Sequence, residues 1–188
     1  MAMKWIVLGL LFEFSIGTYA QQIERRELRE GFLQSLQRKT ALDSFLHKLE
    51  KISSKSPVQE SYFGICNALQ AQYTSSMWTK IRLVTESRGV LNDAVTRSPN
   101  DPELRFMRLT FEHFLPSFLG MSRDIPADLT AILAHPDFVD DSPALKKMAL
   151  EFLINTHHGN ADQNKFLQQQ LADLNKSEPG YGALTSTR

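Results

Sequence analysis

The sequence predicts an all-α protein of about seven helices arranged in antiparallel hairpins. Three observations lead to this fold class. Apolar residues recur every three to four positions along most of the chain. Several of these periodic segments begin with a capping side chain followed by proline, as at Asp101-Pro102 and Ser142-Pro143. Alternating runs of β-branched residues, which would indicate strands, do not occur.

The N-terminal half contains three predicted helices. The longest helical pattern covers residues 23–52 and ends at the polar, proline-containing segment 53–57. A second helix is predicted for residues 58–73 and a third for residues 79–97. Gly89 lies within the third helix and costs about 1 kcal/mol relative to alanine. We therefore expect Gly89 to be a notch into which a neighbouring element packs.

The segment 91–120 predicts the joint of a helix pair and the start of a central helix. Asp101 is a natural N-cap, Pro102 fits the first helical position, and Pro116 should end or kink the helix. Apolar side chains cover most of the circumference, so we expect this helix to be buried on most sides. These side chains are Leu104, Phe106, Met107, Leu109, Phe111, Phe114 and Leu115.

The C-terminal half predicts three further helices, over residues 125–133, 143–156 and 161–174. The apolar face of the middle one is expected to consist of Leu145, Met148, Ala149, Phe152 and Leu153. The small and polar residues 176–188 predict a disordered tail. A single all-α domain is therefore expected for residues 21–175.

The first twenty residues have the features of a signal peptide. A lysine at position 4 precedes a short apolar run, and small residues lead up to Ala20, after which cleavage is expected. The run is too short for a comfortable transmembrane helix, so no stable membrane span is expected after cleavage. These features predict an exported protein, periplasmic or extracellular. The alternative is an apolar N-terminal helix that packs on the domain.

Charge and cysteine content restrict the partners and the chemistry. The 188 residues contain 21 Lys+Arg and 21 Asp+Glu, which gives a formal net charge of zero. A neutral chain without a basic face is not expected to bind nucleic acid. The one cysteine, Cys66, lies among apolar residues and is predicted to be a small core residue.

Helix pairs joined by Pro-Asn-Asp turns resemble tetratricopeptide repeats. The second helix of such a repeat carries an alanine five residues before the turn proline, as Ala94 and Pro99 do here, and Leu91 fits the preceding apolar position. The segment 62–68 resembles a degenerate first helix. No regular 34-residue period is visible. The resemblance implies a degenerate right-handed array of helical hairpins.

A second resemblance covers most of the chain after the signal peptide. The segments Glu103–Arg108 and Pro116–Gly120 are similar to those of a group of uncharacterised exported bacterial proteins. The group shares a signal peptide and a helical layout. This resemblance implies export and an all-α fold.

Arg105, Arg108 and Glu112 are the candidate partner-binding residues. They lie on one narrow face of the predicted central helix. Arginine binds carboxylates through a fixed fork of donors, so this face is suited to a carboxylate on a peptide or ligand. The alternatives are a structural network with Glu103 or Asp101, or plain solvated charge.

A metal site is not expected. His157, His158 and Asp162 form the one metal-like cluster, but neighbouring histidines point about 100° apart on a helix, and helical zinc sites use i,i+4 spacing. We interpret the pair as capping the end of a helix. His113 is expected to be a core or boundary residue. No catalytic residue and no cofactor are predicted.

These observations favour a non-enzymatic module that binds another envelope protein or a peptide, or that serves as a scaffold. Arrays of helical hairpins present concave grooves suited to this role. One alternative is a carrier of an apolar ligand, suggested by the Phe-rich segment 106–118. The other is an enzyme of unrecognised type. The oligomeric state is not predicted.

Overall fold

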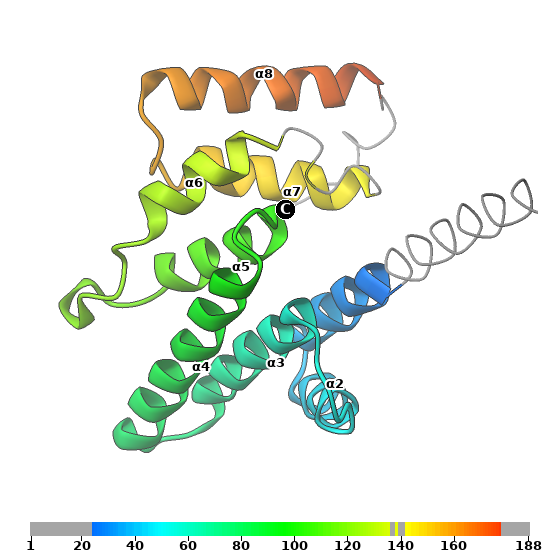
Figure 1. The fold of residues 1–188 in the computed structure, drawn as a ribbon, viewed down its shortest axis with the longest axis vertical. Coiled ribbons are helices and arrows are strands. Elements are labelled where there is room, and N and C mark those ends of the chain that lie inside the picture. The colour runs from blue at the N-terminus through cyan, green and yellow to red at the C-terminus, as the bar shows by residue number, and fades with distance from the viewer. Residues whose placement is uncertain (1–23, 136–137, 139–141, 178–188) are drawn as a thin grey trace, which may run out of the picture. The chain divides into compact units, whose positions relative to one another are not determined.

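The computed structural model describes residues 24–135, 138 and 142–177 (Figure 1). Within these residues all regular structure is helical, with eight α-helices and no strand, which confirms the all-α fold class. The chain divides into two compact units at Val90 and Leu91. The single domain and the tetratricopeptide-like order stay predictions. The signal peptide, its cleavage after Ala20 and the tail beyond residue 177 lie outside the described residues.

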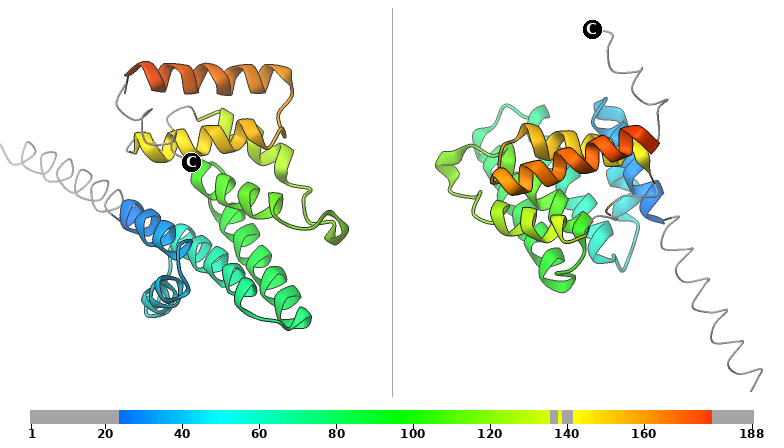
Figure 2. Two further views of the ribbon diagram at one scale, coloured as in Figure 1. Left: turned by 180° about the vertical axis from the view of Figure 1, so that it is seen from behind. Right: turned by 90° about the horizontal axis from the view of Figure 1, so that it is seen from above.

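The first unit consists of a helix over residues 24–35, α2 (Lys39–Glu50), α3 (Pro57–Leu69) and the start of α4 (Met77–Arg97). A short 3₁₀ helix, η1 (Gln70–Tyr73), follows α3 directly. Helix α2 packs on α3. Helix α3 and the first part of α4 run side by side, and η1 lies at the turn between them (Figures 1 and 2).

The prediction of one helix over residues 23–52 is wrong. The helix ends after residue 35, and α2 begins at Lys39. The apolar spacing explains the break, since Leu36 and Leu42 are separated by six positions and would lie about 120° apart around one continuous helix. Two separate helices allow Leu42 to be buried, while Leu36, next to the turn, is exposed.

The core of the first unit contains Cys66, whose side chain is completely buried, as predicted. Burial raises the pKa of the Cys66 thiol to about 12, although a hydrogen bond with Ser35 acts in the opposite direction. Phe32 and Tyr62 meet edge to face with ring centroids 5.7 Å apart. Further buried core residues are Leu28, Leu42, Phe45, Leu46, Leu49, Val58, Ile65 and Leu83.

The buried face of α4 does not follow the apolar residues at the start of the helix. Ile81 is exposed, whereas Leu83, Ser87 and Leu91 are buried. These three residues follow each other at i,i+4 spacing and so lie on one helix face. The buried line passes through a serine, which a search for apolar periodicity does not detect.

Two glycines of the first unit predict opposite effects of the same substitution. A Cβ on Gly31 would lie 2.4 Å from the ring of Phe45, whereas a Cβ on Gly89 would meet nothing within 4 Å. Gly31→Ala should therefore lower the free energy of unfolding by about 1–3 kcal/mol through overpacking. Gly89→Ala should raise it by up to about 1 kcal/mol through helix propensity. Urea denaturation followed by circular dichroism measures both. Equal effects of the two substitutions would contradict the difference in packing around the two glycines. The expectation that Gly89 is a packing notch is wrong, because no neighbouring side chain lies within 4 Å of the position of its Cβ.

The second unit starts with the end of α4 and continues through α5 (Pro102–His113), α6 (Ile125–Leu133), α7 (Pro143–Asn155) and α8 (Ala161–Ser177). Helix α5 packs on α6, and α7 packs on α8. The start of α5 confirms the predicted cap, because the Asp101 carboxylate accepts a hydrogen bond from the Glu103 amide at 3.0 Å. Helix α8 continues three residues beyond the predicted end at residue 174.

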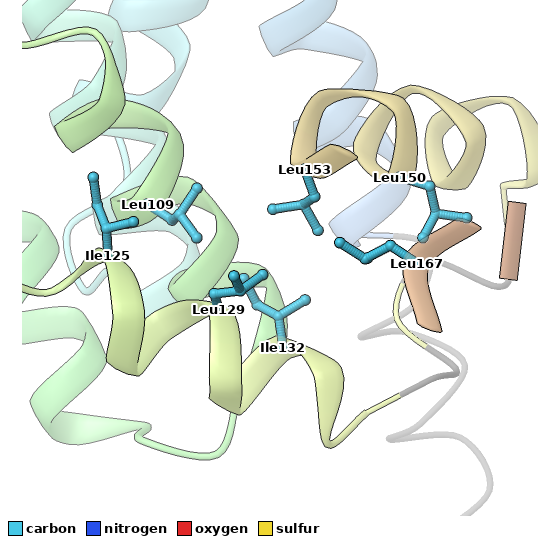
Figure 3. Close-up of a cluster of buried hydrophobic side chains, with 7 residues drawn as sticks. All are labelled: Leu109, Ile125, Leu129, Ile132, Leu150, Leu153 and Leu167. Carbon is cyan, nitrogen blue, oxygen red and sulfur yellow. The ribbon is translucent and has the colours of Figure 1, made fainter. Parts of the chain in front are cut away.

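The core of the second unit is a cluster of aliphatic side chains that point toward one another from four helices (Figure 3). The cluster corrects the predicted face of α7, since Leu150 is buried and Met148 is exposed. The buried face includes Leu150 and Leu153 because both join the cluster that contains Leu167 of α8. The cluster consists of Leu109, Ile125, Leu129, Ile132, Leu150, Leu153 and Leu167.

Candidate functional site

A buried ion network joins α5 to α6. Asp128 of α6 is fully buried, with 0% of its surface exposed. The Arg108 guanidinium binds both of its oxygens, with Nε 2.8 Å from Oδ2 and Nη2 2.6 Å from Oδ1. Arg105 donates to the same carboxylate from Nη1 at 2.9 Å. Two guanidiniums one helical turn apart therefore share one carboxylate.

Each of the two arginines also binds a further group within the protein. Arg108 Nη1 donates to Oδ1 of Asn92 at 3.1 Å, and Arg105 Nε donates to the carbonyl of Pro99 at 3.0 Å. Burial alone would lower the pKa of Arg108, but the hydrogen bonds and charge of Asp128, with smaller contributions from nearby carboxylates, outweigh it and raise the pKa. Arg108 is therefore charged and held inside the unit.

Glu112, the third predicted partner-binding residue, is completely buried. Its Oε2 accepts a hydrogen bond from the Asp124 amide at 3.1 Å, and its main-chain carbonyl accepts one from the Ser122 hydroxyl at 3.2 Å. These bonds tie the connection between α5 and α6 back to α5. The contacts of these residues therefore support the alternative of a structural network. In this network, Asp128 of α6 is the carboxylate that both arginines bind. Partner binding by Arg105, Arg108 and Glu112 stays a prediction.

A chain of aromatic contacts, here called the aromatic–histidine cluster, joins α5, α7 and the turn after α7. Phe152 of α7 lies at its centre, with its ring centroid 5.8 Å from Phe106, 5.4 Å from His113 and 6.0 Å from Phe114. Such separations are typical of aromatic pairs that attract each other. The cluster consists of Phe106, His113, Phe114, Phe138, Phe152 and His158.

Two histidines of this cluster form a hydrogen bond. Nδ1 of His113 and Nε2 of His158 lie 2.9 Å apart, so one ring must donate and the other accept. Burial, together with the charge of His113, lowers the pKa of His158. The structure thus pairs His158 with His113. Among the described residues, no group of three or more metal-ligating side chains could hold an ion.

Acidification should destabilise the fold through His158. The pKa of this residue is lower in the folded state than the ordinary value of 6.5, so the unfolded chain binds the proton first. The contribution is fully present above about pH 6.5 and is lost as the pH falls toward the lowered pKa. Urea midpoints between pH 8 and pH 5 should fall less in His158→Gln than in the parent chain. The exposed His47→Gln control should follow the parent, and identical profiles for all three chains would contradict the effect.

The cluster is open to solvent on one side. Phe114 is 71% exposed although it contacts both Phe152 and His113, and Met148, one turn before Phe152, is 52% exposed. An exposed apolar surface of this kind marks a site of interaction. Phe118, in the short 3₁₀ helix η2 (Ser117–Leu119), is a separate exposed phenylalanine of the same unit, with 84% of its surface exposed. The apolar pattern predicted that Phe114 would be buried, which is wrong. Periodicity does not show where the helix ends, and α5 ends at His113, one residue before Phe114.

A small pocket lies beside this cluster within the second unit. Its volume is about 30 Å³, and its walls include Ile132, Leu150, Leu153 and Leu167. Sites for small organic ligands occupy about 300–1,000 Å³. The pocket is therefore of a size for about one water molecule.

Comparison of the chain with protein-family models, with curated proteins and with solved structures gave no match. Among the helices of the described residues, none combines the length and the apolar character needed to cross a bilayer. The functional argument therefore depends on the geometry of the chain itself.

Proposed function

We propose that this chain is a non-enzymatic protein-binding module, exported to the periplasm or the cell exterior, that binds an apolar segment of another envelope protein. The observation that carries the proposal is the exposure of Phe114 at the open side of the aromatic–histidine cluster. Aromatic side chains supply much of the energy of protein interfaces. The tetratricopeptide-like resemblance of the sequence agrees with such a role.

The surroundings of Phe114 suit a binding anchor. Its ring is supported by His113 at a centroid distance of 5.0 Å and by Phe152 at 6.0 Å. A side chain that is already supported loses less freedom when a partner covers it, which lowers the entropic cost of binding. The histidine pair beside it adds a polar group at the edge of the apolar surface. This arrangement combines an apolar centre with a polar rim, as protein interfaces do.

The alternative of an apolar-ligand carrier has less support. The pocket of about 30 Å³ offers little space for such a ligand. Most of the Phe-rich segment is used for packing or faces solvent, so its side chains serve better as an outer surface than as a cavity wall.

Site-specific photocrosslinking tests the proposal. A photoreactive residue at position 114 should capture a partner from native envelope extract, and one at Gln169, exposed on α8, should not. Phe114→Ala should weaken binding of the captured protein by about 30-fold, as expected for an aromatic hot spot. The matched control Phe166→Ala removes another exposed phenylalanine of the same unit and should bind as the parent does. Equal capture at both positions, or full binding by Phe114→Ala, would overturn the proposal.

A further inference from the structure

A second exposed apolar surface lies on the first unit, at the turn between α3 and α4 (Figure 1). We call it the apolar tip, and it consists of Tyr73, Met77, Trp78 and Ile81. Trp78 is 83% exposed and Met77 65% exposed. Met77 and Trp78 precede Ile81 by four and three positions on α4, so the three side chains share one face of the helix.

The charges nearest the apolar tip have a small positive excess. Between Glu60 and Glu86 the chain has no carboxylate side chain, and its only charged residues are Lys80 and Arg82. Lys39 of α2 places its ammonium 5.7 Å from the centroid of the Tyr73 ring.

Two of these cations form ion pairs. Lys39 pairs with Asp43 at 2.6 Å, and Arg82 pairs with Glu86 at 3.2 Å. Three cations and two carboxylates leave an excess of one positive charge, which corresponds to Lys80.

We propose that the apolar tip binds the surface of a bilayer containing anionic phospholipid. Trp and Tyr are the side chains that favour the membrane–water interface, because one part of each is apolar and the other polar. Met77 and Ile81 would enter the acyl boundary beside Trp78, while the stem of Lys80 lies along the apolar surface and its ammonium meets the phosphates. This contact is made by one exposed helix face and does not depend on the partner-binding surface at Phe114.

Trp78 is itself the probe of this contact. The chain has two tryptophans, Trp5 and Trp78, so Trp5→Phe in the full chain leaves Trp78 as the single indole. Vesicles of phosphatidylcholine with 30% phosphatidylglycerol should shift its emission to the blue and reduce its quenching by acrylamide. The readout is the environment of Trp78, so binding of vesicles by another part of the chain does not count as support.

Variants of exposed residues identify the contact without disturbing the core. Met77→Ser combined with Ile81→Ser should weaken vesicle partitioning, measured through Trp78, at least tenfold. Lys80→Gln, or pure phosphatidylcholine vesicles, should weaken it about fivefold, as expected for one cation at an anionic surface. Leu36→Ser, which removes an exposed leucine outside the apolar tip, is the matched control and should partition as the parent does.

Three results would overturn the proposal. The first is an unchanged Trp78 spectrum with both kinds of vesicle. The second is equal partitioning of the parent and the Met77→Ser/Ile81→Ser variant, with circular dichroism showing both to be folded. The third is a Trp78 shift caused by lipid-free envelope protein and not by vesicles, which would assign the apolar tip to a protein partner.

Discussion

Asp128→Ala should lower the free energy of unfolding by about 3–5 kcal/mol. The substitution leaves Arg105 and Arg108 without the carboxylate that they share, and Arg108 is buried. Removing one partner of a buried ion pair leaves an uncompensated charge, which is far more costly than losing an exposed pair. Urea denaturation followed by circular dichroism measures the loss, and hydrogen exchange should show that protection falls in α5 and α6.

The ion pair of Lys39 and Asp43 is a matched control for this experiment. Its closest approach is 2.6 Å, the same as between Arg108 and Asp128, but both of its side chains are about half exposed. Asp43→Ala should therefore cost less than about 1 kcal/mol. A triple variant that replaces Arg105 and Arg108 by Met and Asp128 by Leu should recover much of the stability lost in Asp128→Ala. Equal losses for Asp128→Ala and Asp43→Ala would show that burial does not decide the strength of the network.

Leu167→Ala should cost about 2–5 kcal/mol and loosen α8. Leu167 is the one residue of α8 that is fully buried among the described residues, with 1% of its surface exposed, and it meets Leu150 and Leu153 of α7 in the core cluster. Truncating a buried leucine removes its transfer free energy and leaves a cavity. Hydrogen exchange should show that the amides of residues 161–177 lose protection before those of the other helices.

The neighbouring residue Phe166 supplies the control. Its side chain is partly exposed, so Phe166→Ala should lower the free energy of unfolding by clearly less than Leu167→Ala does. If the two substitutions had the same effect, or if α8 kept its protection in Leu167→Ala, the attachment of α8 would not depend on Leu167.

The elements of the fold were predictable where their signals are local. The Asp101 cap with Pro102, and the prolines at the starts of α6 and α7, place three helix starts within a residue or two. The break after residue 35 was missed because no glycine or proline marks it. The burial of Ser87 on α4 is not predictable from apolar periodicity, because a polar residue does not contribute to an apolar pattern.

The candidate site was predictable only in part, because its contacts join distant positions. Periodicity brought Arg105, Arg108 and Glu112 to one face of α5, but their partner Asp128 lies on the next helix, 20 positions after Arg108. His158 was placed at a helix end, yet its hydrogen-bond partner His113 is 45 positions away. The exposure of Phe114 and Trp78 depends on which elements cover them, and helical spacing alone does not determine this.

Because Cys66 is buried, the rate at which its thiol is alkylated reports how often the first unit opens. Only the thiolate reacts quickly with alkylating reagents, and Cys66 is both fully covered and held protonated by a pKa of about 12. The folded chain therefore presents almost no reactive sulfur, while every opened chain presents one. The rate of Cys66 alkylation by a dilute reagent in native buffer would then measure the frequency of opening of the first unit. This measurement needs neither denaturant nor an added label.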